Sequence, residues 1–199
     1  MIAETRVLLT RHGQSEWNAL GRWQGQADPP LSDLGRRQAH EAARALGAID
    51  GIWASDLKRA AETAVVIGED MGVGPVVLDP DLRERDAGEW TGLTRAEIEQ
   101  RYPGFLPDGR RPPGWESDEL LLDRAQRTMR RIADAAPGGE VLVVTHAGVV
   151  FAVERHLGLD HTRLANVEGR WVTVAHGGLR LGDRMLLAEP QDVTVPRQM

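Results

Sequence analysis

Cysteine is absent from this chain of 199 residues, and aromatic residues make up only 5% of it, although six of them are tryptophan. Without a thiol, the protein has no disulfide framework, no thiolate-bound metal and no cysteine nucleophile. Any covalent catalysis in this chain must therefore use another nucleophile.

Long apolar runs are missing as well. No segment approaches the ~20 apolar residues that span a bilayer. The opening residues, MIAETRVLLT, contain too short an apolar run for the core of a signal peptide. We therefore expect a cytoplasmic protein that has no membrane partner.

Charge of one sign is in excess, because 30 acidic residues face 24 basic ones and the net charge is −6. An acidic balance argues against a nucleic-acid partner, since phosphate neutralisation needs a basic face. Taken alone, it also disfavours a negatively charged substrate. The length and the 41% hydrophobic content are typical of an ordinary globular chain, and we expect a single domain over residues 1–199.

Short apolar runs alternate with helical patterns along the chain. The expected strands cover residues 6–10, 51–54, 76–78 and 141–144, with a late hairpin at 171–175 and 179–181. The expected helices cover residues 32–46 (Ser32 as N-cap), 55–71, 94–102 (a Thr94/Glu97 capping box), 118–135 and 148–157. This alternation predicts a three-layer α/β/α fold with a mainly parallel central sheet. The Pro- and Gly-rich stretch 102–114 interrupts it and predicts an inserted flap around residues 94–117.

Polar residues follow three of the expected strands. In open α/β sheets, functional groups gather at the carboxyl ends of the strands. The residues placed there are Arg11, His12, Arg59 and His146, followed by Ala147 and Gly148 at a helix start. Arginine donates paired hydrogen bonds to phosphate oxygens, and the free N–H groups of a helix start bind anions. This arrangement indicates phosphoryl chemistry.

The same residues lie within a set of motifs. These are TRHGQSEWN at 10–18, GRWQGQADPPLSDLGRRQA at 21–39, SDLKRAAETA at 55–64, LRERDAGEWTG at 82–92, WES at 115–117 and VTHAGVV at 144–150. Together they resemble the histidine phosphatase superfamily, also called phosphoglycerate mutase-like, in its branch of small bacterial phosphatases. The resemblance implies that fold, and a metal-independent phosphomonoester hydrolase that needs no cofactor and acts through a phosphohistidine.

The resemblance also implies a role for each matching position. His12 is the expected nucleophile, and Glu84 the acid that protonates the leaving oxygen and then the base that activates water. Arg11, Arg59, Asn18 and His146 are expected to hold the phosphoryl oxygens, with Gln24, Gly25, Ala147 and Gly148 as further phosphate or substrate contacts. Physical chemistry supports the nucleophile independently, because neighbouring arginine charges disfavour a protonated imidazole.

Several of these residue types also have plainer interpretations. Glu84 stands in a charged run, residues 83–89, of the kind that is often merely solvated. Of Trp17, Trp23, Trp90 and Trp115, we expect at least two to pack as core and the others to wall the substrate pocket. His40 is expected on a helix surface, and a metal pair of His156 and His161 is not expected. Arg110 and Arg111 are expected to be solvated, or else to contact an anionic end of the substrate.

Two alternative functions stay open at this point. A phosphoglycerate mutase shares the same catalytic core, and a non-catalytic phospho-ligand-binding regulator would keep the same pocket. Hydrolysis of a small phosphorylated metabolite is favoured, because the arginines at 95–111 do not match the spacing of the mutase insertion, and because mere binding needs neither His12 nor Glu84. The motifs look like phosphatases of glucosyl-3-phosphoglycerate and of α-ribazole phosphate, but loops 102–114 and 161–170 match neither pattern, so the substrate stays open. A homodimer is possible through the edge of the late hairpin.

Overall fold

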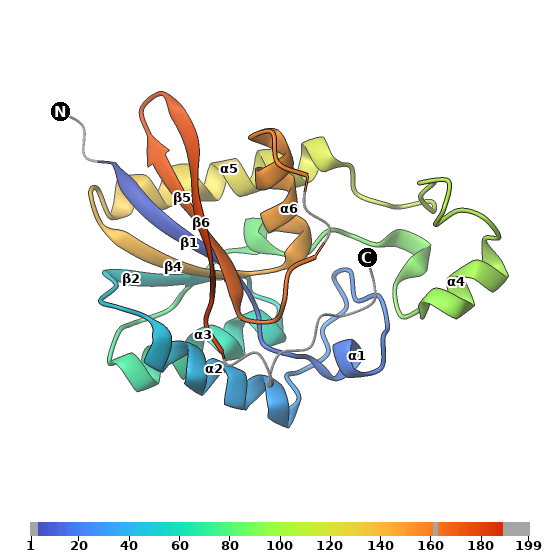
Figure 1. Ribbon diagram of the computed structural model, residues 1–199, viewed down its shortest axis with the longest axis horizontal. Coiled ribbons are helices and arrows are strands. Elements are labelled where there is room, and N and C mark those ends of the chain that lie inside the picture. Colours follow the sequence, from blue (N-terminus) through green and yellow to red (C-terminus); the bar gives the residue numbers. More distant parts are fainter. Residues whose placement is uncertain (1–3, 161–162, 189–199) are drawn as a thin grey trace.

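A six-stranded sheet forms the centre of the computed structural model, which describes residues 4–160 and 163–188 (Figure 1). The strands are β1 (Thr5–Arg11), β2 (Gly51–Ala54), β3 (Val77–Leu78), β4 (Glu140–Thr145), β5 (Glu168–Ala175) and β6 (Gly178–Leu186), in the order β3-β2-β4-β1-β5-β6. Strands β3, β2, β4 and β1 pair with one another in parallel. The hairpin of β5 and β6 continues the sheet beside β1, and its pairings are antiparallel. The prediction of a mainly parallel sheet is confirmed.

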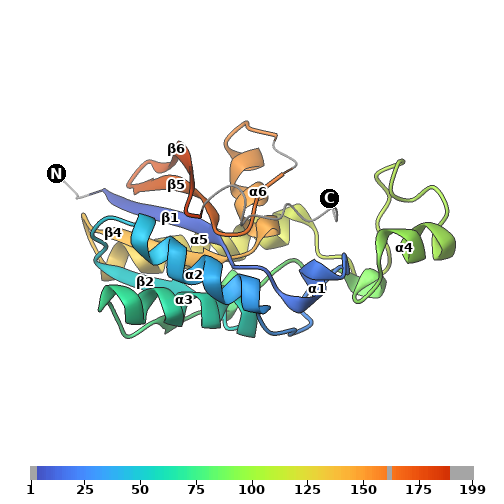
Figure 2. The ribbon, with the colours of Figure 1, turned by 60° about the horizontal axis from the view of Figure 1, so that its bottom comes forward.

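Helices cover both faces of the sheet, which confirms the three predicted layers (Figures 1 and 2). The helices in the described part of the chain are α1 (Glu16–Ala19), α2 (Asp33–Ala45), α3 (Lys58–Met71), α4 (Arg95–Arg101), α5 (Asp118–Ala135) and α6 (Ala147–His156), with two 3-10 turns at Pro80–Leu82 and Gly88–Trp90. One apolar core joins α5 and α6 to the sheet, and a second joins α2 and α3 to its other face. Among the described residues, none of these helices has the length and apolar character needed to cross a bilayer.

The strands sort their side chains between these two cores by simple alternation. In β1, Val7 and Leu9 face α5 and α6, whereas Leu8 faces α2 and α3. In β4, Val141 and Val143 likewise face α5 and α6, whereas Leu142 and Val144 face α2 and α3. A strand that is buried on both faces needs an unbroken apolar run, which is why VLL and VLVV could be recognised in the sequence.

Local capping sets where the helices begin. Ser32 accepts a hydrogen bond from the Gly35 amide at 3.1 Å, and Thr94 and Glu97 form the predicted capping box at α4. The expected start of α3 at residue 55 was wrong, because α3 begins at Lys58. Asp56 does not cap it and instead pairs with Arg83 at 2.6 Å. Helix α1 and the two 3-10 turns were not predicted, since each is too short to show a period.

The predicted flap segment (residues 94–117) carries α4 and lies beyond the carboxyl end of the sheet (Figure 1). A third apolar cluster of Trp90, Leu93 and Ile98 supports it, with Trp23 and Trp115 packed against that cluster. Of the four tryptophans in the motifs, only Trp90 is fully buried. One of the four is thus a core residue, fewer than the two expected, whereas Trp23 and Trp115 are partly buried and line the cavity described below, as expected of the others.

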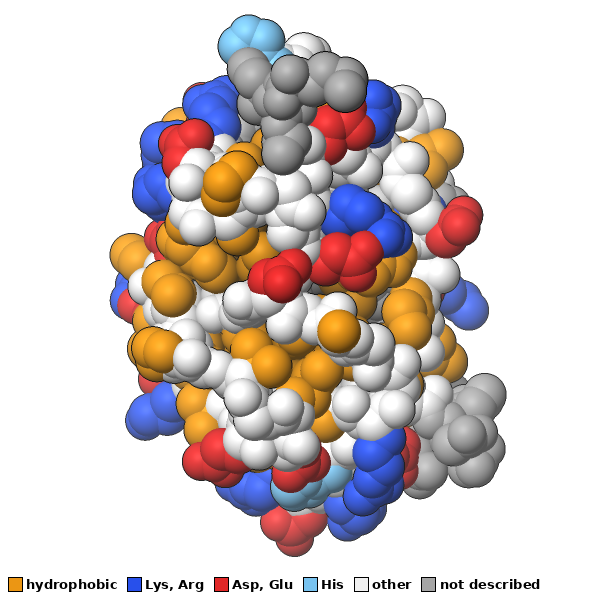
Figure 3. Space-filling view, turned by 90° about the vertical axis from the view of Figure 1, so that its left-hand side faces the viewer, with side chains coloured by type: hydrophobic (Ala, Val, Ile, Leu, Met, Phe, Trp, Pro, Cys, Tyr) orange, Lys and Arg blue, Asp and Glu red, His pale blue; other side chains and the backbone are white. Residues whose placement is uncertain are grey.

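The opposite end of the molecule has a different surface. There a band of apolar side chains is surrounded by charged groups of both signs (Figure 3). The net charge of −6 is thus a sum over a mixed surface. It does not describe the local potential at the carboxyl end of the sheet, where the arginines lie.

Candidate active site

Three strand ends bring their polar residues together, as the sequence predicts. Arg11 is the last residue of β1 and His12 follows it, Arg59 lies in the first turn of α3 after β2, and His146 precedes α6 after β4. All four side chains are buried. The rings of His12 and His146 meet edge to face, with their centroids 5.1 Å apart.

His12 is held as a neutral imidazole with one nitrogen available. Its Nδ1 lies 2.5 Å from the carbonyl oxygen of Gly13, so Nδ1 carries the proton and donates it, which leaves the lone pair on Nε2. Burial, and then the charges of Arg59 and Arg11, hold the pKa of His12 well below its usual range. A neutral imidazole with a free Nε2 is the form that attacks phosphorus.

Arg11 and Arg59 supply positive charge beside this ring. Arg11 donates to the carbonyl oxygen of Leu164 at 2.6 Å, and Arg59 donates to those of Ala27 and Gly25 at 2.7 and 2.9 Å. Burial lowers the pKa of each guanidinium to about 10, so both stay charged at neutral pH. The backbone carbonyls hold the two guanidinium groups in fixed orientations.

Several buried polar atoms around His12 have no hydrogen-bond partner among residues 4–160 and 163–188. They are the Nε atoms of Arg11 and Arg59, and both ring nitrogens of His146. Buried polar atoms are nearly always paired, so an unpaired cluster indicates a site shaped for a ligand. Two cationic donors and an imidazole suit an anion with several acceptor oxygens, such as a phosphoryl group.

Glu84 lies in the loop between the two 3-10 turns, and its carboxylate faces the start of α6. Its Oε1 accepts from the amide of Arg85 at 2.7 Å, and its Oε2 accepts from the amide of Gly148 at 3.3 Å. The amide of Gly148, expected to contact phosphate, thus binds the carboxylate of the expected acid. The interpretation of run 83–89 as merely solvated does not hold for Glu84 or for the buried Arg85, and the exposed carboxylates of Asp86 and Glu89 also accept hydrogen bonds, from the Gly88 amide and the Tyr102 hydroxyl.

These residues open onto one cavity of about 450 Å³. The predicted site residues in its lining are Arg11, His12, Gln24, Gly25, Glu84, Ala147 and Gly148. The other three, Asn18, Arg59 and His146, are buried outside that lining. Arg59 is linked to the lining through Gly25, and His146 through the ring of His12.

Asn166 is a residue of this site that no sequence motif singled out. It is fully buried, and its Nδ2 donates to the carbonyl oxygen of His12 at 3.0 Å and to Oδ1 of Asn18 at 3.5 Å. Asn18 Oδ1 also accepts from the amide of Ser15 at 3.1 Å. The side-chain oxygen of Asn18 therefore faces these two donors. The only sequence signal for Asn166 was a polar residue between apolar ones just before β5.

The two adjacent arginines of the flap segment, Arg110 and Arg111, differ in their relation to the outer part of the cavity. Arg111 lines the cavity, with its guanidinium 5.0 Å from the centre of a Trp115 ring, and burial lowers its pKa. Arg110 instead pairs with Asp108 at 2.7 Å and lies over Phe105. Both arginines are exposed, as expected, and Arg111 also forms part of the cavity wall, which is the position that contact with an anionic end of the substrate would need.

His40 and His156 are not part of the lining of this cavity. His40 is exposed on α2, as predicted, and lies 2.7 Å from Asp70. His156 ends α6, while His161 lies outside the described residues. Within residues 4–160 and 163–188, no group of three or more His, Asp or Glu side chains is arranged to hold a metal ion.

Comparison with known proteins agrees with this geometry. Residues 7–181 match the family described as the histidine phosphatase superfamily, branch 1. The chain is 39% identical over 162 residues to a glucosyl-3-phosphoglycerate phosphatase of Mycolicibacterium vanbaalenii, covering 74% of this chain and 72% of that protein. It is 38% identical over 159 residues to a metal-independent phosphoserine phosphatase of Arabidopsis thaliana, covering 75% and 67%.

A solved structure gives the same result. The mycobacterial glucosyl-3-phosphoglycerate phosphatase in complex with VO3 superposes with a TM-score of 0.81 at 31% identity, covering 89% of this chain and 97% of the other. The family match over residues 7–181 includes all the predicted site residues. The chain belongs to the histidine phosphatase superfamily and is a phosphomonoester hydrolase of that type.

Proposed function

We propose that His12 carries the phosphoryl group during hydrolysis, while Glu84 moves the protons. The observation that supports this most strongly is the set of unpaired nitrogens on Arg11, Arg59 and His146 around a neutral imidazole. A phosphoryl group bound beside the lone pair of Nε2 would accept hydrogen bonds from Arg11 in the cavity lining, and from the N–H groups of Arg59 and His146 that are buried next to His12. Positioning and charge stabilisation supply most of what phosphoryl transfer requires.

The first step forms a bond between His12 Nε2 and phosphorus and breaks the bond from phosphorus to the leaving oxygen. Glu84, in its carboxylic acid form, gives its proton to that oxygen, so the leaving oxygen departs as a hydroxyl group and not as an alkoxide. Arg11 and Arg59 balance the charge on the phosphoryl oxygens, and His146 donates to one of them. A positioned acid contributes roughly 10²–10⁴-fold to the rate of such a step.

The second step returns the enzyme to its starting state. A water molecule attacks phosphorus while the Glu84 carboxylate takes one of its protons. The bond between phosphorus and Nε2 breaks, inorganic phosphate leaves, and His12 is again a neutral imidazole. Glu84 ends as the carboxylic acid that the next cycle needs.

For the substrate, we propose a small phosphorylated metabolite that carries a carboxylate. The cavity of about 450 Å³ exceeds the needs of a phosphoryl group, and Arg111 adds a cation to its outer wall. Two of the relatives are phosphatases of phosphoserine and of glucosyl-3-phosphoglycerate, and each of those compounds has a carboxylate near its phosphate. A guanidinium forms paired hydrogen bonds with a carboxylate.

Trapping the phosphoenzyme tests the proposed nucleophile. Wild-type protein incubated with a ³²P-labelled monoester and quenched in base should retain an acid-labile label, and His12→Ala should retain none. His40→Ala, which changes an exposed histidine, should label like the wild type. Acid-labile label on His12→Ala would overturn the assignment.

A panel of metabolite phosphates, read for released phosphate with EDTA present, tests the substrate class. Carboxylate-bearing monoesters should be the best substrates. Isomerisation of 3-phosphoglycerate at a rate comparable to its hydrolysis would instead favour the mutase. No hydrolysis of any monoester would favour a binding protein.

A cytoplasmic location and a homodimer are also proposals. The dimer is supported by the position of β6 at one edge of the sheet, where it pairs only with β5 among the described strands. Light scattering of the purified protein would measure the oligomeric state, and cell fractionation the compartment.

A further inference from the structure

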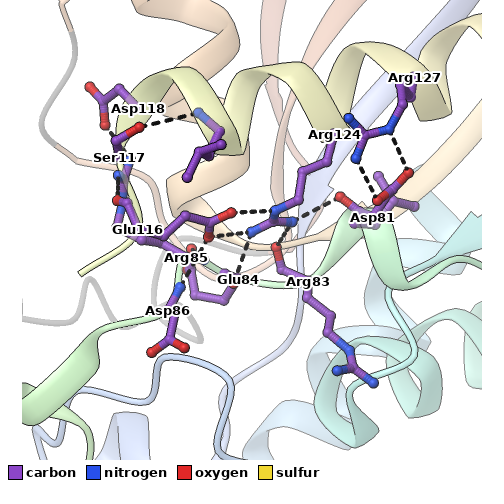
Figure 4. Close-up of polar contacts among 12 residues, drawn as sticks. Asp81, Arg83, Glu84, Arg85, Asp86, Glu116, Ser117, Asp118, Arg124 and Arg127 are labelled. Carbon is purple, nitrogen blue, oxygen red and sulfur yellow. Dashed lines mark hydrogen bonds and ion pairs between the residues drawn. The ribbon is translucent and has the colours of Figure 1, made fainter. Parts of the chain in front are cut away.

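Arg124 is a buried arginine of α5 whose guanidinium has a full set of partners outside its own helix. Its Nε and Nη2 donate to the two carboxylate oxygens of Glu116 at 2.7 and 2.8 Å, as a paired fork (Figure 4). Its remaining hydrogens reach the carbonyl oxygens of Asp81 at 2.8 Å, of Glu84 at 3.0 Å and of Arg83. One side chain thus binds three carbonyls of the segment that ends at Glu84.

Glu116 holds the same segment from its other end. Its Oε2 accepts from the amide of Asp86 at 3.1 Å, and its own amide donates to the carbonyl of Asp86 at 3.1 Å. The carbonyl of Glu116 accepts from the guanidinium of Arg85 at 2.5 Å. Glu116 is also the next-to-last residue of the flap segment. The Arg124–Glu116 pair therefore joins α5, the end of that segment and both sides of Glu84.

Residues 83–87 lie between two 3-10 turns and belong to no strand or helix. Backbone groups in such a segment still need hydrogen-bond partners, and here Arg124 and Glu116 provide several of them. The Glu84 carboxylate rests on the amide of Arg85, its immediate neighbour, so its position depends on this backbone. A misplacement of about 1 Å in a catalytic group costs on the order of 10²-fold in rate.

Burial alone would raise the pKa of Glu116, but the hydrogen bond and charge of Arg124 outweigh it and leave that pKa below its usual range. Glu116 is thus the charged partner of the guanidinium. From these contacts, we propose that the Arg124–Glu116 pair is a positioning pair for Glu84, which sets how well its carboxyl group protonates the leaving oxygen. This inference rests on the role of Glu84 proposed above.

The test compares two substrates that differ in their need for an acid. Dinitrophenyl phosphate has a leaving group that departs without a proton, whereas the alkyl ester β-glycerophosphate requires one. The measured quantity is kcat/KM, which reports the steps up to phosphoryl transfer. The variants are Glu116→Gln, which keeps the shape, and Arg124→Lys, which keeps the charge but loses the fork.

We expect both variants to lower kcat/KM for the alkyl ester about 10- to 100-fold, and to lower it less than about 3-fold for the dinitrophenyl ester. Arg127→Gln is the matched control, because Arg127 stands on the same helix and pairs with the Asp81 carboxylate at the surface. It should leave both values unchanged. Thermal unfolding shows which variants fold, and Glu116→Gln alone suffices if Arg124→Lys does not.

Equal losses on both esters, or no loss on either, would overturn the positioning role. Glu84→Gln serves as the reference for the chemistry itself. If Glu84→Gln is selective for the alkyl ester and the pair variants are not, only the inference fails. If Glu84→Gln affects both esters equally, the proposed acid role of Glu84 fails, and the inference fails with it.

Discussion

The backbone of Gly148 lies directly against the carboxylate of Glu84. The amide donates to Oε2 at 3.3 Å, and a β-carbon at this position would overlap Oε1 and lie 3.2 Å from Cδ. Glycine therefore leaves room for the acid here, because a β-carbon would fill the space that the Glu84 carboxylate occupies. The close approach couples the first turn of α6 to the loop that carries Glu84.

We expect Gly148→Ala to displace the Glu84 carboxylate and to lower kcat/KM for an alkyl phosphate by about 10²-fold. The fold should survive, because the group that must move is the end of a side chain facing the cavity. Steady-state kinetics and a thermal unfolding curve measure the two effects. Gly47→Ala is the control, since nothing lies within 4 Å of the added carbon there. Wild-type activity in Gly148→Ala would mean that the contact is dispensable.

His146 combines a cost in stability with a role in the site. Both ring nitrogens are buried and have no partner within the described part of the chain, and an unsatisfied buried polar group costs about 1–3 kcal/mol. His146→Leu removes both atoms at a similar volume, so the free energy of unfolding should rise by about 1 kcal/mol or more. Activity should fall by roughly 10²–10³-fold, the usual loss when one donor to a developing charge is removed.

Urea unfolding would measure the gain in the free energy of unfolding, and steady-state kinetics the loss of activity. His40→Leu is the matched control, because His40 is exposed and its partner is Asp70. That variant should show no gain in stability and no loss of activity. A His146→Leu protein that is less stable than the wild type would contradict the prediction.

The buried imidazoles also predict how stability changes with pH. Burial, and then the charge of Arg59, lowers the pKa of both His12 and His146 well below 6.5 in the folded state. Below pH 6.5 the unfolded chain therefore binds protons that the folded chain does not. The free energy of unfolding falls with decreasing pH in that window, by up to about 1.4 kcal/mol per pH unit for each imidazole, and this contribution is constant above it.

Urea titrations between pH 7.5 and 5.0 check the size and the sign of this slope. The comparison of wild type with His146→Leu isolates one imidazole from the carboxylates that titrate at lower pH. The variant should lose stability less steeply between pH 6.5 and 5.0. Parallel curves for the two proteins would show that His146 is not kept neutral by the fold.

The sequence allowed most of the scaffold to be predicted. Helix α5 was predicted to the residue, and the apolar runs of β1 and β4 were identifiable because strands buried on both faces need them. The convergence of Arg11, Arg59 and His146 followed from the rule that functional groups gather at the carboxyl ends of parallel strands. The expectation against an anionic substrate failed as a guide, because net charge is a sum over the surface and the site is local.

Other features depend on contacts between segments that are remote in the sequence. Asn166 binds the backbone of His12 from 154 positions away, and Arg124 reaches Glu84 from 40 positions away. No local pattern reports such pairs, because each residue alone resembles an ordinary polar side chain. Arg111 lines the cavity and Arg110 does not, because of the path of an irregular loop, and hydrophobic periodicity in the sequence does not predict such a path.

Those two adjacent arginines give the last prediction, on substrate choice. Arg111 lines the cavity beside Trp115, whereas Arg110 pairs with Asp108 at the surface. Arg111→Gln should therefore raise KM for a carboxylate-bearing monoester by about 10-fold, the typical scale of one charge-assisted hydrogen bond. The KM for a monoester whose alkyl group is uncharged should change by less than about 2-fold. Arg110→Gln should change neither value. Only a side chain that touches the carboxylate discriminates between the two esters. Arg111 therefore does not bind this group if the two variants have equal effects, or if Arg111→Gln affects both substrates equally.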